Sequence, residues 1–201
     1  MMRRMRLFTS DTSPYGRKVR IVLAEKALAE RVEIVTQSPF DKDVSALRAV
    51  NPLGRIPALV SEQGRTLYDS RVICEYLDGL AANPILIPEG GPSRIDTLRR
   101  QALGDGLMDA AFNLVMERRR PETQRSQEWS ARWTDAIYRA VVAMEADLNE
   151  TFDLGAISFA AALGYADFRL GDLDWPARAP KVAAWWDVVG QRASLKSTAP
   201  A

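Results

Sequence analysis

The stretch FTSDTSPYGRKVRIVLAEK, residues 8–26, joins a short apolar segment to an amphipathic helical pattern through the tetrapeptide SPYG at residues 13–16. The apolar segment, residues 5–9, predicts a strand, and the spacing of apolar residues over 16–27 predicts a helix. Residues 31–36, RVEIVT, alternate as a second strand does. Strand, helix and strand in this order imply a parallel pair joined by a right-handed crossover.

The following segments complete an α/β half. Residues 44–50 predict a short helix that stops before the sequence NPLG. Residues 56–61 and 65–68 predict an antiparallel hairpin around the turn at 62–64, and residues 70–80 return to helical spacing. The order β-α-β-α-β-β-α over the first 80 residues is that of a thioredoxin-like domain with a small mixed sheet.

Beyond this half the pattern changes to helices alone. Residues 81–93, AANPILIPEGGPS, are rich in Pro and Gly and predict a linker. The helices expected after it cover 95–118, 127–149, 154–168 and 180–192. The sequence therefore predicts an α/β thioredoxin-like N-terminal domain over residues 1–80, a linker over 81–93 and an all-α helical C-terminal domain over 94–201.

Composition excludes several classes of function. The 201 residues carry 27 basic and 26 acidic side chains, a net charge of +1, which leaves no overall field to attract nucleic acid or an anionic membrane surface. No apolar run approaches the roughly 20 residues that span a bilayer, and the single Cys74 excludes an internal disulfide, so we expect a cytoplasmic protein. The absence of His argues against zinc hydrolase, Ser-His-Asp and Cys-His chemistry, and we expect no metal.

Ser13 occupies the corner between the first strand and the first helix. The first N–H groups of a helix lack partners, so this corner favours an anion. In thioredoxin-like oxidoreductases the corner carries Cys-Pro-Tyr-Cys, whereas Ser13 and Gly16 replace both cysteines here, and disulfide exchange through this motif is impossible. A serine hydroxyl can instead donate a hydrogen bond to the thiolate of a ligand. The alternative is that Ser13 serves only as a helix N-cap.

Two further segments have features of a peptide-binding site. In NPLGRIPALV, residues 51–60, Pro57 opens an apolar strand, and a cis Ile56–Pro57 bond would turn the backbone of Ile56 toward a peptide-like ligand. The alternative is an ordinary trans proline. At the next helix start, the free N–H groups with Ser70 suit a ligand carboxylate and Asp69 suits an ammonium group, unless Ser70 is a plain N-cap.

The segments SPYGRKVRIVLAEK, NPLGRIPALV and LYDSRVICEYL, followed by ALGYADFR, together resemble a cytosolic glutathione S-transferase of the bacterial type, with a serine at the thiol-activating position. The resemblance covers nearly the whole chain. Asp69 departs from the Glu that is frequent in the family. Asp153 can cap the helix that follows it, but Ala156 replaces the Asp of the usual capping box, a loss of about 1 kcal/mol of helix stability.

The resemblance implies which residues bind glutathione. Ile56, beside Pro57, would bind the cysteinyl unit through its backbone, and Asp69 and Ser70 would hold the γ-glutamyl end. Arg55 would reach the glycyl carboxylate, unless it is simply an exposed arginine in a turn. The co-substrate is therefore expected to be glutathione, with no metal.

The resemblance also assigns the catalytic role to Ser13, whose hydroxyl would bind the glutathione sulfur and lower the pKa of its thiol. A charged hydrogen bond contributes about 1.5 to 3 kcal/mol and a helix terminus about 0.3 to 1 kcal/mol. Since one pKa unit corresponds to about 1.4 kcal/mol, these two effects can lower the pKa by about one to three units. The thiolate would then attack a small apolar electrophile held beside it.

The electrophile pocket is expected to include Tyr15 and, from the helix at 95–118, Asp105, Met108, Asp109 and Phe112. The apolar members have a core alternative, and the two aspartates have a solvated or dimer-facing one. Gly104 and Gly106 in the same helix suggest a close approach of another backbone or a ligand.

We expect a detoxifying homodimer that binds neither nucleic acid nor a membrane. The functional alternatives are a member of the fold that binds glutathione or a protein without catalysis, and a glutathione-dependent dehalogenase, isomerase or peroxidase.

Overall fold

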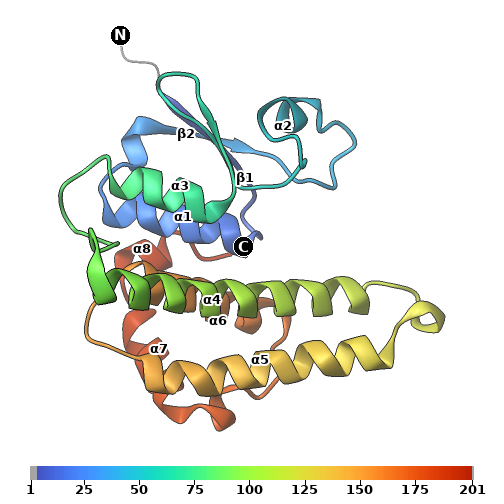
Figure 1. Ribbon diagram of the computed structural model, residues 1–201. Coiled ribbons are helices and arrows are strands. Elements are labelled where there is room, and N and C mark those ends of the chain that lie inside the picture. Colours follow the sequence, from blue (N-terminus) through green and yellow to red (C-terminus); the bar gives the residue numbers. More distant parts are fainter. Residues whose placement is uncertain (1–3, 201) are drawn as a thin grey trace. The chain divides into compact units, whose positions relative to one another are not determined.

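Figure 1 shows the computed structural model, which describes residues 4–200. The described chain forms two compact units, residues 4–87 with 197–200 and residues 88–196. The first unit contains β1 (Met5–Thr9), α1 (Pro14–Glu25), η1 (Ala29–Arg31), β2 (Val32–Thr36), α2 (Ser45–Val50), β3 (Ala58–Val60), β4 (Thr66–Leu67) and α3 (Ser70–Asp78). Its sheet has the order β2-β1-β3-β4, with β1 and β2 parallel and the other pairs antiparallel. The thioredoxin-like fold expected from the sequence is confirmed.

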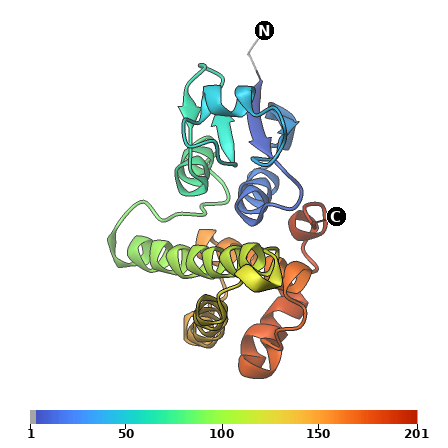
Figure 2. The same cartoon turned by 90° about the vertical axis from the view of Figure 1, so that its right-hand side faces the viewer.

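Side chains alternate between the two faces of this sheet. Phe8, Ala58 and Val60 form a buried cluster with Leu47 of α2 on one face. On the other face α1 and α3 lie side by side, below the sheet in Figures 1 and 2, and pack against each other. Helices therefore cover both faces of the sheet, and the groups that could bind a ligand lie at the ends of its strands.

The strand register decides which ends meet. Phe8 of β1 lies opposite Ala58 of β3, and Leu59 of β3 lies opposite Leu67 of β4. The end of β1, the start of β3 and the end of β4 therefore share one edge of the sheet. The helices α1 and α3 both begin at this edge, because each follows a strand that ends there.

The second unit is all-helical. It contains α4 (Gly91–Arg118), η2 (Glu122–Gln124), α5 (Gln127–Asp147), α6 (Leu154–Arg169), η3 (Pro176–Arg178), α7 (Pro180–Val189) and α8 (Ala193–Lys196). The helix α6 is buried along most of its length, as its nearly uncharged sequence predicts. A Cβ atom added to Gly104 of α4 would lie 2.7 Å from the main-chain carbon of Ser158 in α6, so these helices approach closely there. Within residues 4–200 nothing lies within 4 Å of the same position on Gly106, so a close approach of another backbone is confirmed at Gly104 only, and the approach of a ligand at Gly106 stays a prediction.

The start of α6 is fixed by a buried carboxylate. Asp153 accepts a hydrogen bond from the Ala156 N–H at 3.1 Å, which confirms it as the N-cap. Thr97 Oγ1 of α4 donates to the same carboxylate at 2.8 Å, and Arg100 of α4 forms an ion pair with it. The cap therefore also joins α4 to α6.

Two helices begin earlier than their sequence patterns predict. The helix α1 starts at Pro14 rather than at residue 16, and α4 starts at Gly91, inside the stretch 81–93 expected to be a linker. In both cases a proline lies in the first turn, where its missing N–H would have had no acceptor. The prolines of the stretch 81–93 were interpreted as part of a linker, whereas Pro92 lies in the first turn of α4.

Candidate functional site

Ser13 is the N-cap of α1. Its backbone is extended (φ −82°, ψ 120°), and its Oγ accepts a hydrogen bond from the Gly16 N–H at 3.1 Å. The capping role weighed from the sequence is thus confirmed. Accepting this bond leaves the hydroxyl proton for donation, and no acceptor for it exists among residues 4–200. The half-buried hydroxyl therefore keeps a donor for a ligand at the positive end of a helix.

Gly16 allows the first turn of α1 to press against the end of β1. A Cβ atom at this position would collide with Thr9 Oγ1 and lie 3.3 Å from the Ser13 Cβ. No side chain fits without a shift of the neighbours, which explains why glycine stands where a redox-active corner has its second cysteine. The role of Thr9 was not predicted from the sequence, because the collision depends on how β1 and α1 lie in space.

Asn51 organises the loop that leads into β3. Its buried side chain donates to the Arg55 carbonyl at 2.7 Å and accepts from the Leu53 N–H at 3.0 Å. The following Ile56–Pro57 bond is cis. Neither the N–H nor the C=O of Ile56 has a hydrogen-bond partner in the part of the chain that the structure describes. The loop thus presents a backbone N–H and C=O that can bind an extended peptide, as the unpaired backbone of an outer strand does.

The role of Asn51 was also missed, although its place at the start of a Pro- and Gly-containing turn is a usable signal for such a side-chain bond.

At the start of α3, the cap differs from the one weighed in the sequence. Asp69, not Ser70, is the N-cap, and its Oδ1 accepts from the Arg71 N–H at 2.9 Å. The interpretation of Ser70 as a plain cap is therefore wrong. The Ser70 residue is buried, and its hydroxyl has no hydrogen-bond partner among residues 4–200. Asp69 is exposed and has a second oxygen available for a cation.

The sheet register brings these groups to one edge. Ser13 follows β1, Ile56 precedes β3, and Asp69 and Ser70 follow β4. The edge thus combines two helix N-termini, a hydroxyl donor, a backbone N–H and C=O, and one carboxylate. Arg55 is exposed in the adjoining loop, and its guanidinium forms no ion pair within the described chain. Such a set suits a peptide-like ligand with anionic groups and one ammonium group.

The residues expected around the electrophile lie on two helices. Tyr15 is half-buried in α1, and the others lie on α4. Asp105 and Met108 are buried, with 2% and 0% of their surface exposed, whereas Phe112 is half-buried and Asp109 is exposed. The solvated alternative is therefore wrong for Asp105.

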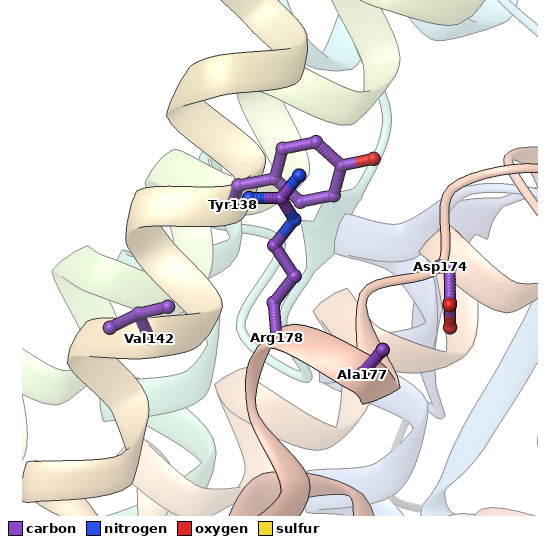
Figure 3. A pocket seen from close by; sticks show the side chains of 5 residues that line it. All are labelled: Tyr138, Val142, Asp174, Ala177 and Arg178. Carbon is purple, nitrogen blue, oxygen red and sulfur yellow. The ribbon is translucent and has the colours of Figure 1, made fainter.

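A cavity of about 520 Å³ lies in the second unit (Figure 3). It is lined by Tyr138, Val142, Asp174, Ala177 and Arg178. The Arg178 Cζ atom lies 4.2 Å from the centre of the Tyr138 ring, so the protein's own arginine already covers this aromatic face. The cavity contains none of the residues predicted from the sequence.

Within residues 4–200 no helix combines the length and the apolar character needed to cross a membrane. The same part of the chain holds no cluster of three or more His, Cys, Asp or Glu side chains arranged to bind a metal ion.

Comparison with known proteins gives the family. Residues 7–85 match the family model of the glutathione S-transferase N-terminal domain. The uncharacterized GST-like protein YibF of Escherichia coli K12 is 32% identical over 202 residues, which cover 98% of each chain. The chain therefore belongs to the glutathione S-transferase family.

Solved structures of relatives match nearly the whole chain. A glutathione transferase family member from Pseudomonas fluorescens Pf-5, with bound glutathione, is 40% identical with a TM-score of 0.90, covering 98% of this chain and 99% of that one. A structure of this family member with S-(propanoic acid)-glutathione is 39% identical, with a TM-score of 0.88 and coverage of 98% and 97%. A glutathione S-transferase from Methylobacillus flagellatus KT, also with glutathione bound, is 39% identical, with a TM-score of 0.91 and coverage of 98% and 100%.

Proposed function

We propose that this protein is an active glutathione S-transferase in which Ser13 stabilises the thiolate of glutathione for attack on a small electrophile. The observation that carries the proposal is the half-satisfied hydroxyl of Ser13, which accepts one bond from Gly16 N–H and retains its proton. Glutathione bound in two relatives about 40% identical supports glutathione as the co-substrate.

The remaining groups of the edge match the parts of this tripeptide. We infer that the open N–H and C=O of Ile56, beside Pro57, bind the cysteinyl unit. The start of α3 would hold the γ-glutamyl carboxylate through Ser70 and its ammonium group through Asp69. Arg55, which is exposed in the adjoining loop, would bind the glycyl carboxylate. Each assignment pairs a group of the protein with a part of the ligand of opposite charge or hydrogen-bonding character.

The thiol would be activated by two effects that favour its charged form. A hydrogen bond from Ser13 to the sulfur contributes about 1.5 to 3 kcal/mol, and the N-terminus of α1 contributes about 0.3 to 1 kcal/mol. The thiol proton passes to solvent, and the thiolate forms a carbon–sulfur bond as the electrophile loses its leaving group or accepts the electron pair. The protein acts by activation and proximity.

For the electrophile, the proposal includes Tyr15, Asp105, Met108, Asp109 and Phe112. Phe112 and Asp109 are the members of the α4 set that keep exposed surface, so they are better placed to contact a substrate than the buried Met108 and Asp105. The sequence favours an apolar electrophile. The S-linked propanoic acid bound by the Pseudomonas fluorescens relative supports electrophiles that also carry a carboxyl group. A cytoplasmic homodimer with a detoxifying role completes the proposal.

A titration of the glutathione thiol tests the catalytic role. Thiolate absorbance near 240 nm is followed against pH for glutathione bound to the wild type and to Ser13→Ala. We expect a lowered thiol pKa on the wild type and a value higher by about one to two units on the variant, because a charged hydrogen bond is lost.

Ser126→Ala is the matched control. Ser126 caps α5 through the Trp129 N–H at 3.2 Å, so this variant loses the same kind of cap and should leave the thiol pKa unchanged. Glutathione that binds to the wild type with an unshifted thiol pKa would contradict the transferase and support the non-catalytic binding protein. Product analysis with haloalkane, isomerisable and peroxide substrates separates conjugation from the dehalogenase, isomerase and peroxidase alternatives.

A further inference from the structure

The C-terminal ends of α4 and α6 lie together in the second unit. The two helices run parallel, because they are joined at both ends: Thr97 near the start of α4 bonds to Asp153 at the start of α6, and Arg118 at the end of α4 bonds to Asp172 just beyond α6. At their far ends Arg118 of α4 forms two hydrogen bonds with Asp172, just beyond α6, at 2.7 and 2.8 Å. Residues of the last turns of both helices are therefore neighbours.

Tyr165 presents a donor at this end. The residue is 6% exposed, so its ring is packed, and its hydroxyl has no hydrogen-bond partner among residues 4–200. The hydroxyl oxygen is not itself fully enclosed. Burial raises the pKa of the phenol, while the nearby cations Arg169 and Arg119 act in the opposite direction. The phenol therefore stays protonated at neutral pH and can donate a hydrogen bond.

Two arginines of these helix ends, Arg169 of α6 and Arg119 of α4, are near enough to the phenol to act on it electrostatically. Arg169, one turn after Tyr165 on α6, holds its Cζ atom 4.0 Å from the centre of the Phe168 ring. The Arg119 Nη1 atom lies 4.0 Å from the Met116 sulfur. Neither guanidinium forms an ion pair within the described chain, in contrast to the neighbouring Arg118. Two positive groups and a neutral donor thus lie at the same end of this helix pair, and the two arginines contact the half-buried side chains of Phe168 and Met116.

We propose that Arg119, Tyr165 and Arg169 form a binding site for the carboxylate of a small organic anion. The guanidinium groups supply the paired N–H donors that match a carboxylate, and the phenol supplies a third donor. The half-buried Phe168 and Met116 side chains favour an organic anion over an inorganic one, because they can cover its apolar part. Binding at this site does not depend on the proposed transferase function. The anion is either an electrophile of that reaction or a separate effector.

Calorimetric titration of the full chain without glutathione tests the binding. The probes are 4-chloro-3-nitrobenzoate and the uncharged 4-chloro-3-nitrobenzamide, which share a shape. We expect the wild type to bind the acid at least about tenfold more tightly, since charged hydrogen bonds to the carboxylate are absent in the amide. The double variant Arg119→Ala/Arg169→Ala should lose this preference, and Tyr165→Phe should weaken it several-fold while keeping the ring in place.

Arg139→Ala is the matched control, because it removes an exposed arginine of α5 from the same unit and should not change the preference. Equal binding of acid and amide by the wild type would overturn the proposal, as would a double variant that keeps the preference. Inorganic phosphate that competes as well as the acid would also overturn it, because the organic part would then contribute nothing.

The kinetics with glutathione distinguish the two sources of the anion. In this reaction the carbon–sulfur bond forms, the carbon–chlorine bond breaks, and chloride leaves as the thiol proton goes to solvent. If the anion is the electrophile, the double variant raises KM for the acid at least about tenfold and leaves KM for the amide unchanged. Unchanged KM values with weakened binding identify an effector site. Absence of turnover contradicts the transferase alone, because the calorimetric result is independent of it.

Discussion

Two helix N-caps, one in each unit, use the same local motif, but one has a structural role and the other is a candidate for function. Ser13 caps α1 with a single bond to the Gly16 N–H and keeps its proton. Asp153 caps α6 with a bond to the Ala156 N–H and also binds Thr97 and Arg100. The second cap has its charge and oxygens satisfied by the protein, so it can only hold structure together. In the first cap the Ser13 hydroxyl accepts a bond but does not donate one within residues 4–200, and this unused proton makes the cap a candidate for function.

The largest effect is expected from Asp153→Ala. The substitution removes the cap and leaves the Arg100 guanidinium, whose side chain is 7% exposed, without its counter-ion. Loss of one partner of a buried ion pair typically costs about 3 to 5 kcal/mol. Urea unfolding measures this loss of unfolding free energy, and the double variant Asp153→Ala/Arg100→Met should recover part of it. A loss below about 1 kcal/mol in the single variant would show that the hydrogen bonds and ion pair of Asp153 do not stabilise the fold.

Gly16→Ala should cost less. The new methyl group collides with Thr9 Oγ1, and overpacking of this kind costs about 1 to 3 kcal/mol. A double-mutant cycle with Thr9→Ala, followed by thermal unfolding, isolates the clash, since Thr9→Ala removes the obstructing oxygen. Additive effects of the two substitutions would refute the close approach of α1 to the end of β1.

Ser13→Ala should have a smaller effect on stability. Loss of a serine cap costs about 0.5 to 2 kcal/mol, and Ser126→Ala at the start of α5 gives the reference for a cap without a proposed function. We expect similar losses of unfolding free energy for the two variants, so that a change in glutathione chemistry belongs to Ser13 alone. A much larger loss at Ser13 would mean that its hydroxyl is a structural hub, as Asp153 is.

The smallest effect is expected from Arg99→Gln. Arg99 precedes Arg100 on α4, but its side chain is 55% exposed, and its pair with Asp147 should contribute less than about 1 kcal/mol. The hydrogen bond from Arg99 lowers the pKa of the Asp147 carboxyl. The stabilisation is therefore present above the unfolded value near pH 3.9 and is lost as the pH falls through the lower folded pKa.

Unfolding of wild type and Arg99→Gln from pH 7 down to pH 2 measures this dependence. The difference between the two proteins should shrink at the acid end, and a constant difference would contradict the assignment to Asp147.

The two caps also show how far sequence reasoning reaches. Both were identifiable from short patterns, because a cap depends on residues within one turn, and the thioredoxin-like order followed from the periodicity of short segments. What separates the caps depends on partners remote in sequence. Thr97 and Arg100 lie 56 and 53 residues before Asp153, and no local pattern indicates them. For the same reason the collision at Gly16 was not predicted, nor was Arg119, whose nearness to Tyr165 depends on α4 and α6 running parallel.

The close approach at Gly16 also restricts how this corner can change over evolutionary time. A single substitution of Ser13 by cysteine would give the corner one thiol with little rearrangement. A second thiol at position 16 would meet Thr9, so a dithiol corner requires changes at three positions, and the change at position 16 would be harmful unless position 9 had changed first. Under the proposed function, Gly16 would therefore keep this corner dependent on a thiol brought by another molecule.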